Sequence, residues 1–206
     1  MTTTFDDALH FVLRWEGGLS DDPDDRGGRT MKGITQRVYD AWRRSQNRVP
    51  QDVATIADDE LAAIYRDNYW TKASCHQLQA KLDLVQFDTG VNMGTNRAIK
   101  ILQQAVDTAS DGVFGPGTLA ACQACTPADA VARYCAIRED LYKTFAQRQG
   151  QAKFFRGWMN RLNDLRAEAG VRGFPRKRER GRVDFGDTGF IAHIPDVAPD
   201  QPLDAW

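Results

Sequence analysis

The chain has 206 residues, of which 42% are hydrophobic and 27% charged, and its formal net charge is −1. These values suit one ordinary domain or two small ones, exclude wholesale disorder, and give no global attraction to nucleic acid. No apolar stretch approaches the roughly 18 residues of a membrane span. The N-terminus lacks the features of a Sec-type signal peptide, so we expect a protein made in the cytoplasm without stable membrane insertion.

The first predicted element is a helix from about residue 5, because Thr4 and Asp7 resemble a capping box. Apolar side chains at positions 5, 9, 12 and 13 recur at helical spacing, and Gly17 with Gly18 ends the helix. Residues 19–33 are rich in Asp and Gly, which is typical of turns and allows a short hairpin.

The rest of the chain is predicted to be helical. Helices capped by Thr35, Asp58 and Asp83 come first, followed by a helix over 96–107. Turns are expected at 111–112 and 115–117, then a long helix opened by Thr126-Pro127 and a last helix over about 152–169. The sequence therefore predicts a mainly α fold with one small β element.

Charge is spread unevenly along the chain. Residues 131–182 hold 14 Lys and Arg against 5 Asp and Glu, whereas residues 183–206 hold five Asp and no Lys or Arg. The latter stretch also carries three prolines, which is typical of an extended arm. The basic run at 176–180 has two interpretations: a solvated hinge, or attraction to an anionic polymer such as a cell wall.

Four cysteines are too few for a disulfide scaffold, and Cys122 with Cys125 forms a single CxxC pair. The three histidines show no zinc-ligand spacing, so we expect no metal and no cofactor. The interpretation we favour is ordinary thiols on helices, and a redox pair is the alternative.

Glu16 is the first candidate for chemistry. It continues the apolar stripe of the first helix, which places it toward the core at the predicted last turn. Burial and the negative end of the helix dipole both favour a protonated carboxyl there, and a protonated carboxyl is a general acid. The alternative is a structural Glu paired with Arg14 or another cation.

Further candidates are carboxylates and aromatic residues elsewhere in the chain. The Asp-rich loop after Glu16 supplies possible second carboxylates, a pairing that glycoside hydrolysis uses. Asp88 shares an apolar face, with Asn92 one turn later, and either a buried ion pair or substrate contact fits it. Tyr69 and Trp70 are adjacent aromatic residues, which are more often part of the core, and stacking on sugar rings is the alternative.

Residues 15–35, WEGGLSDDPDDRGGRTMKGIT, resemble the signature of glycoside hydrolase family 108, the lysozyme-like N-acetylmuramidases of phage endolysins. The Tyr-Trp, Phe-Asp and Val-Asn-x-Gly elements of residues 69–106 resemble the same family. The stretch DGVFGPGTLAA and the final AKFFRGWMNRL resemble an accompanying predicted peptidoglycan-binding module. The likeness covers about residues 5–170 and implies a lysozyme-like helical fold.

Carried over, the resemblance makes Glu16 the catalytic acid and Asp25, nine residues later, its partner carboxylate. Thr30 resembles the threonine of phage-type lysozymes, although one residue early. Tyr69, Trp70, Asp88 and Asn92 are then expected to bind substrate. Residues 1–82 form the expected catalytic region and 83–175 the second helical region, packed into the same fold. Residues 176–206 form a basic hinge and acidic tail.

The resulting hypothesis is a peptidoglycan hydrolase that cleaves the β-1,4 bond between N-acetylmuramic acid and N-acetylglucosamine. We expect a phage endolysin that reaches the periplasm or cell wall after holin release. Alternatives are a secretion-system effector with an immunity protein as partner, a lytic transglycosylase, or a non-catalytic peptidoglycan-binding or secretion-accessory protein. A nucleic-acid-binding role based on residues 131–182 is disfavoured, because no helix-turn-helix signature is present.

Overall fold

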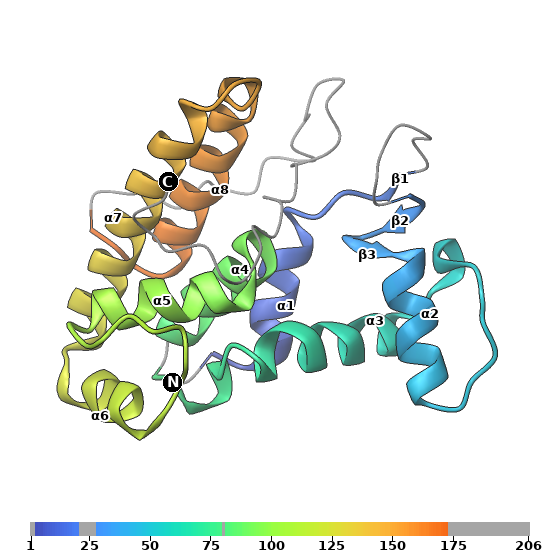
Figure 1. The fold of residues 1–206 in the computed structure, drawn as a ribbon, viewed down its shortest axis with the longest axis horizontal. Coiled ribbons are helices and arrows are strands. Elements are labelled where there is room, and N and C mark those ends of the chain that lie inside the picture. Colours follow the sequence, from blue (N-terminus) through green and yellow to red (C-terminus); the bar gives the residue numbers. More distant parts are fainter. Residues whose placement is uncertain (1–2, 21–27, 80, 173–206) are drawn as a thin grey trace.

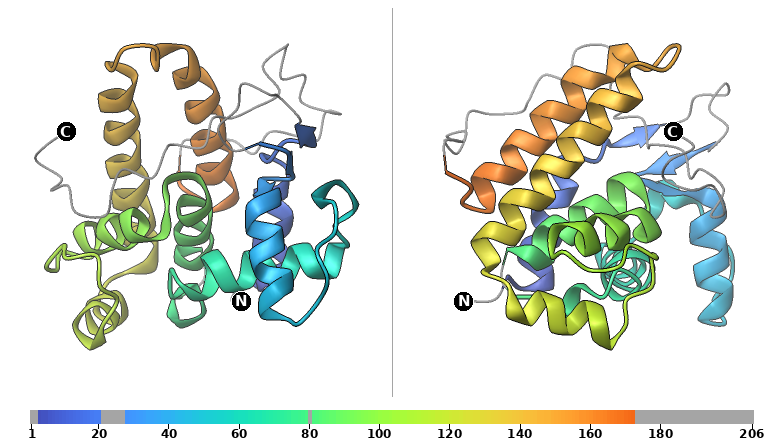
Figure 2. Two further views of the ribbon diagram at one scale, coloured as in Figure 1. Left: turned by 45° about the vertical axis from the view of Figure 1, so that its right-hand side comes forward. Right: turned by 60° about the vertical axis from the view of Figure 1, so that its left-hand side comes forward.

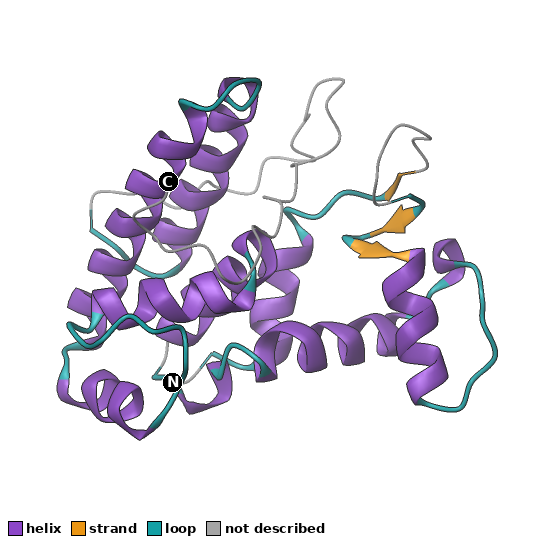
Figure 3. Ribbon diagram, in the orientation of Figure 1, coloured by secondary structure: helices purple, strands orange, loops and turns teal. Residues whose placement is uncertain are grey.

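The computed structural model describes residues 3–20, 28–79 and 81–172. Within these ranges the chain forms eight α-helices and one small three-stranded antiparallel sheet (Figures 1 and 3). This arrangement confirms the predicted mainly α class with a small β element after the first helix. No described helix is both long and apolar enough to cross a membrane.

Helix α1 (Phe5–Leu13) begins with the predicted capping box. The Thr4 hydroxyl accepts a hydrogen bond from the Asp7 amide at 3.2 Å, and the Asp7 carboxylate accepts one from the Thr4 amide at 3.3 Å. The apolar face of α1 packs against helix α4 (Leu82–Met93). The helix ends at Leu13, earlier than the predicted stop at Gly17, so Glu16 follows the helix instead of occupying its last turn.

The sheet follows α1 and contains β1 (Leu19–Ser20), β2 (Thr30–Met31) and β3 (Ile34–Thr35) in sequential antiparallel order. Strands β2 and β3 are joined by Lys32 and Gly33, whose φ angles are both positive at 46° and 77°. Two such residues are what a tight type I′ hairpin requires. The short hairpin expected within residues 19–33 is present as the pairing of β1 with β2, and β3 adds a third strand just after it.

Helix α2 (Gln36–Ser45) is capped by Thr35, whose hydroxyl accepts the Val38 amide hydrogen bond at 3.2 Å, as predicted. Helix α3 (Asp58–Tyr65) runs on into a π-helical turn (Arg66–Thr71) that the sequence did not predict. Asp58 is the first helical residue and not the cap, because Ala57 takes the extended capping conformation. Short 3₁₀ turns lie at Val53–Thr55 and Cys75–Gln77.

Helix α4 (Leu82–Met93) lies at the centre of the molecule, and every one of its residues is buried. It packs against α1, α5 (Thr95–Ala105) and α7 (Pro127–Ala146). Its cap is Lys81, in the left-handed region, so Asp83 lies inside the first turn and was wrongly predicted to be the cap. Helix α6 (Pro116–Ala124) begins within the predicted turn at 115–117, because proline suits the first position of a helix.

Helices α7 (Pro127–Ala146) and α8 (Phe155–Glu168) form an antiparallel pair at one end of the molecule, and α2 and the sheet lie at the other (Figures 1 and 2). A 3₁₀ turn (Ala152–Phe154) leads into α8. A single cluster of buried apolar residues runs from Phe5 to Leu165. The boundary predicted between residues 82 and 83 falls in the first turn of α4, and residues on both sides of it belong to this shared core.

Some sequence predictions concern residues outside the described ranges. These are the Asp-rich loop with Asp25, the basic run at 176–180 and the acidic tail at 183–206.

Candidate functional site

Glu16 lies in the segment that connects α1 to the sheet. Its side chain is 15% exposed, so the carboxyl is largely enclosed and still has a path to solvent. Because α1 ends three residues earlier, Glu16 is not part of the last helical turn in which the sequence placed it. The predicted ion-pairing alternative is met, but the cation is Arg161 of α8 and not Arg14.

The two oxygens of Glu16 have different surroundings. Oε1 accepts a hydrogen bond from Arg161 Nη1 at 2.9 Å. Oε2 faces the hairpin, since a Cβ built on Gly33 would lie 2.9 Å from it and 2.8 Å from the Tyr65 hydroxyl. Gly33 therefore lets the hairpin approach the carboxyl as closely as it does.

Tyr65 supports the hairpin from α3. Its hydroxyl donates a hydrogen bond to the Lys32 carbonyl at 2.8 Å. Burial and the nearby Glu16 carboxylate raise the pKa of the Tyr65 phenol well above its ordinary 10.0, so the hydroxyl remains a neutral donor.

The segment that carries Glu16 is fastened to α8 at two further points. Trp15 Nε1 donates to the Asp164 carboxylate at 2.9 Å, and Arg14 forms an ion pair with the same carboxylate at 3.4 Å. Three consecutive residues, 14–16, thus contact side chains one turn apart on α8. The position of the candidate acid is set by the C-terminal helix as well as by α1.

Behind Glu16 lies a buried ionic cluster centred on Asp88 of α4. Arg161 Nε donates to Asp88 Oδ1 at 2.8 Å, and Arg138 Nη1 of α7 donates to Oδ2 at 2.6 Å. Burial opposes ionisation of Asp88, but the two guanidinium groups outweigh it, and the pKa of the carboxyl lies below its ordinary 3.8. Together with Glu16, the cluster pairs two carboxylates with two guanidinium groups.

Arg138 is held in turn by side chains of α4 and α7. Its guanidinium donates to Thr89 Oγ1 at 3.0 Å, to Asn92 Oδ1 at 3.3 Å and to the Tyr142 hydroxyl at 2.7 Å. The Tyr142 hydroxyl donates to the same Asn92 oxygen at 2.5 Å. Asp88 and Asn92 are both buried inside this network, which favours the ion-pair interpretation of Asp88 over substrate contact.

The two predicted aromatic residues occupy different environments. Trp70 is buried and packs edge-on against Phe5 and Phe87, at ring-centroid distances of 5.6 and 5.3 Å. This is the core placement that the residue pattern alone favoured. Tyr69 is half-buried beside Tyr65, at 5.5 Å between ring centroids, so sugar stacking stays a prediction for Tyr69 alone.

Thr30 lies on β2 and is buried, and its hydroxyl donates to the Gly28 carbonyl at 3.0 Å. In this arrangement the hydroxyl fastens the end of the Asp-rich loop to the sheet. Asp25 lies outside the described residues, so its separation from Glu16 is not part of the site geometry.

Two functional candidates were missed in the sequence, namely Arg138 and Arg161. Each was identifiable by the signal that singled out Asp88, a charge within an apolar helical stripe. Arg138 lies four residues after Tyr134 and four before Tyr142, and Arg161 lies between Trp158 and Leu162 on the buried face of α8. Helical spacing showed that these arginines face inward, but not which acids they meet.

The thiols and possible metal ligands add no second reactive centre within the described ranges. Burial raises the pKa of the Cys122 thiol to about 11, which keeps it protonated and unreactive at neutral pH. Cys125 Sγ donates to the Cys122 carbonyl. This arrangement favours the ordinary-thiol interpretation over a redox pair. No group of three or more His, Cys, Asp or Glu that could hold a metal is found among the described residues.

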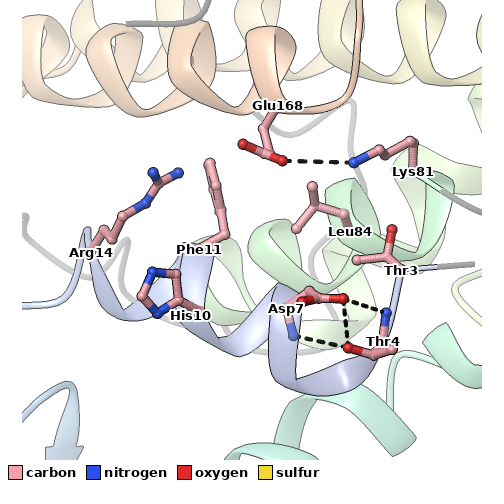
Figure 4. Close-up of a pocket in the computed structure, with 9 residues that line it drawn as sticks. All are labelled: Thr3, Thr4, Asp7, His10, Phe11, Arg14, Lys81, Leu84 and Glu168. Carbon is pink, nitrogen blue, oxygen red and sulfur yellow. Dashed lines mark hydrogen bonds and ion pairs between the residues drawn. The ribbon is translucent and has the colours of Figure 1, made fainter. Parts of the chain in front are cut away.

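A pocket of about 670 Å³ lies along α1, next to the start of α4 and the end of α8 (Figure 4). A Lys81–Glu168 ion pair of 3.7 Å spans it. Glu16 and Arg161 are absent from its lining, so this pocket is separate from the candidate acid. The lining residues are Thr3, Thr4, Asp7, His10, Phe11, Arg14, Lys81, Leu84 and Glu168.

Comparison with known proteins identifies the family of the chain. The family model described as glycosyl hydrolase 108 matches residues 9–94, and one described as a predicted peptidoglycan domain matches residues 97–163. A search of curated proteins found no match. The solved structure of Brucella abortus SagA is similar at 32% sequence identity and a TM-score of 0.68, over 84% of this chain and 97% of that chain. The chain therefore belongs to the glycosyl hydrolase 108 family and is a glycoside hydrolase that acts on peptidoglycan.

Proposed function

We propose that the protein is an N-acetylmuramidase, which cleaves the β-1,4 bond between N-acetylmuramic acid and N-acetylglucosamine with Glu16 as general acid. The observation that carries the proposal is the Glu16 carboxyl itself. It is largely enclosed, anchored through one oxygen to a buried arginine, and open to solvent over 15% of its side chain. A fixed carboxyl beside solvent is suited to protonating the oxygen of a leaving sugar.

In this mechanism Glu16 protonates the glycosidic oxygen as the bond to the N-acetylmuramic acid carbon breaks. The oxocarbenium-like carbon that results needs a second carboxylate, either as a stabiliser and nucleophile or as a base that activates water. We assign that role to Asp25, on the basis of its nine-residue spacing from Glu16 and its match to the family motif. Alanine at Asp25 is expected to cost more turnover than alanine at Asp21 or Asp24, and equal losses in all three variants would contradict the assignment.

Mass spectrometry of the muropeptides released from purified sacculi tests the bond specificity. An N-acetylmuramidase releases fragments with N-acetylmuramic acid at the reducing end, and Glu16→Gln should release almost none while keeping the wild-type circular dichroism spectrum. Anhydro sugars would show a lytic transglycosylase, and N-acetylglucosamine at the reducing end would show the other glycosidic bond. Either product would contradict the muramidase proposal.

We place this activity in bacterial lysis by a phage endolysin, supported by the resemblance of residues 15–35 to the motif found in such enzymes. Production in the cytoplasm of a Gram-negative host should then lyse cells only when a holin is co-produced. A secretion-system effector would instead be neutralised by an immunity protein encoded beside it. If the cells lyse without a holin, and if co-production of the neighbouring immunity protein prevents this lysis, the endolysin assignment is contradicted.

A further inference from the structure

Arg161 is the only residue in the described part of the chain seen to contact both Glu16 and Asp88. Nη1 donates to Glu16 at 2.9 Å, while Nε donates to Asp88 at 2.8 Å, with Nη2 also 2.8 Å from the same Asp88 oxygen. Its side chain is 1% exposed. The guanidinium plane is therefore fixed along one edge by Asp88 and presents the remaining nitrogen to Glu16.

The residue that fixes Arg161 is itself immobilised. The second oxygen of Asp88 accepts a hydrogen bond from Arg138, and both side chains of that pair are fully buried. Tyr142, which binds Arg138, stacks on Trp158 of α8 with ring centroids 5.4 Å apart and planes inclined by 16°. Arg161 thus projects from a rigid support built by α4, α7 and α8.

The contact determines what each oxygen of Glu16 can do. A guanidinium group only donates hydrogen bonds, so the Oε1 atom that faces Arg161 acts as an acceptor whether or not the carboxyl is protonated. The transferable proton then belongs on Oε2, the oxygen that faces Gly33 and the hairpin. Arg161 therefore fixes both the direction of the carboxyl and the atom from which the proton departs.

We propose that Arg161 is a positioning residue of the glycosidase reaction, acting through Glu16, with Asp88 and Arg138 as its support. The proposal rests on the catalytic role given to Glu16 above. It also changes the meaning of the second sequence segment, since Arg138 and Arg161 lie in the part that matches a predicted peptidoglycan domain, residues 97–163. Residues 97–163 therefore complete the catalytic site of the glycosidase region, which we define as residues 9–94, whether or not they also bind peptidoglycan.

A purely structural role for Arg161 makes a different prediction. If its task were only to neutralise Asp88, its loss would lower stability without slowing the folded enzyme. Glu60 and Arg43 offer a matched control, because they form another buried ion pair, at 2.7 Å, with no contact to Glu16 in the described structure. Substitutions at Arg43 remove a comparable ion pair and leave the candidate acid in place.

The test compares Arg161→Lys and Arg161→Gln with Arg43→Lys and Arg43→Gln on soluble uncrosslinked glycan strands. We expect kcat of Arg161→Gln to fall about 10²-fold, the effect of a misplacement near 1 Å. KM should change less than about twofold, because the lost contact is made to the acid and not to the substrate. Arg161→Lys should recover part of kcat because it keeps the charge, but not all of it, since an ammonium cannot hold two carboxylates in the fixed fork of a guanidinium. Both Arg43 variants should keep wild-type kcat per folded molecule.

Glu16→Gln is measured alongside. If it is inactive while folded Arg161 variants keep wild-type kcat, the positioning proposal is overturned and the proposed function stands. If Glu16→Gln is itself fully active, the catalytic assignment fails first and the role of Arg161 fails with it. An equal fall in kcat for the Arg43 variants would also overturn the proposal, because any buried ion pair would then have the same effect.

A second measurement needs no substitution of Arg161. The side-chain nitrogen NMR signals of Arg161 are compared between wild-type protein and Glu16→Gln, which removes a charge at a partly exposed position. We expect slow rotation of the guanidinium in the wild type and a shift of its Nη1 signal in Glu16→Gln. Identical Arg161 signals in the two proteins would overturn the proposal even if no Arg161 variant folded.

Discussion

Glu60 and Asp88 are both buried carboxylates held by two arginines, but they join very different parts of the chain. Glu60 binds Arg43 and Arg48, which lie 17 and 12 residues away, and it also accepts a hydrogen bond from Tyr39. Asp88 binds Arg138 and Arg161, which lie 50 and 73 residues away. The Glu60 cluster ties one helix pair together locally, whereas the Asp88 cluster joins the glycosidase region to the C-terminal helices.

The two clusters also differ in exposure and in what lies beyond them. Arg48 is half exposed, so solvent weakens part of the Glu60 cluster, whereas the Asp88 pairs are shielded throughout. Buried ion pairs stabilise a fold little compared with well-packed apolar side chains, so burial alone does not account for the Asp88 cluster. The extension of Arg161 to Glu16 gives that cluster a task that the Glu60 cluster lacks.

Substitution of the central carboxylate, Asp88 or Glu60, should distinguish the roles of the two clusters most clearly. Asp88→Asn leaves the buried Arg138 without a counter-ion and leaves Arg161 with Glu16 as its partner carboxylate, and we expect a loss of about 3–5 kcal/mol in the free energy of unfolding. Its turnover per folded molecule should also fall, because Arg161 loses its support. Glu60→Gln should lower stability less and leave turnover unchanged. Urea denaturation and initial rates on glycan strands measure both quantities, and a slow Glu60→Gln enzyme would contradict the distinction.

Gly33→Ala tests the hairpin side of the same site. The left-handed φ of 77° should cost about 1–2 kcal/mol for any residue with a Cβ. The added methyl would also meet Glu16 Oε2 and the Tyr65 hydroxyl, so turnover should drop as well. Gly170 is a matched control, because its φ is also 77° and its surroundings are open. Gly33→Ala should lose more stability than Gly170→Ala, because only its methyl meets other atoms, and turnover should slow in Gly33→Ala only. Slowed turnover in both variants would point to a general loosening of the structure.

Stability should fall in acid, partly through Asp88. Its pKa in the folded protein lies below the ordinary 3.8, so the unfolded chain binds this proton more readily. The contribution of Asp88 is therefore complete above about pH 4 and is lost as the pH falls through the lower folded-state value. Denaturation of the wild type and of Asp88→Asn between pH 6 and pH 2, sampled about every half unit, measures this. The two curves should converge in acid, and parallel curves would contradict the lowered pKa.

The smallest effect is expected at the contact beside Glu16. Trp15→Phe keeps an aromatic ring in place and removes the Nε1 donor to Asp164. A loss of about 1 kcal/mol in unfolding free energy is expected for one hydrogen bond. Turnover should decrease only slightly, because Arg161 still holds the carboxyl. A loss of turnover as large as that of Arg161→Gln would mean that the Trp15–Asp164 contact, and not the guanidinium, positions Glu16.

Local signals in the sequence were enough to predict most of the helices. The capping box at Thr4, the cap at Thr35 and the Pro127 start of α7 depend on neighbours within a few residues, and they were correct. The predictions failed where tertiary contacts determine the end of a helix. Helix α1 ends early, and residues 14–16 instead bind α8, nearly 150 positions later.

The candidate site follows the same division. Glu16 was identifiable from its place after an apolar stripe and from its motif, because both are local. Its link to Asp88 through Arg161 was not, since spacing along one helix reveals an inward charge without its partner. Trp70 shows a different limit of local signals. It belongs to an aromatic pair that was expected to bind substrate, but its side chain is buried in the core.

The central claim is that one catalytic carboxyl is positioned by an arginine from the other sequence segment, and a double-mutant cycle on turnover tests it most directly. Rates are measured with excess enzyme and long incubation for wild type, Glu16→Gln, Arg161→Gln and the double variant. If Arg161 acts through Glu16, its substitution should cost nothing more once the acid is gone, and the double variant should match Glu16→Gln. If the two losses multiply, Arg161 acts independently of Glu16 and the claim is contradicted.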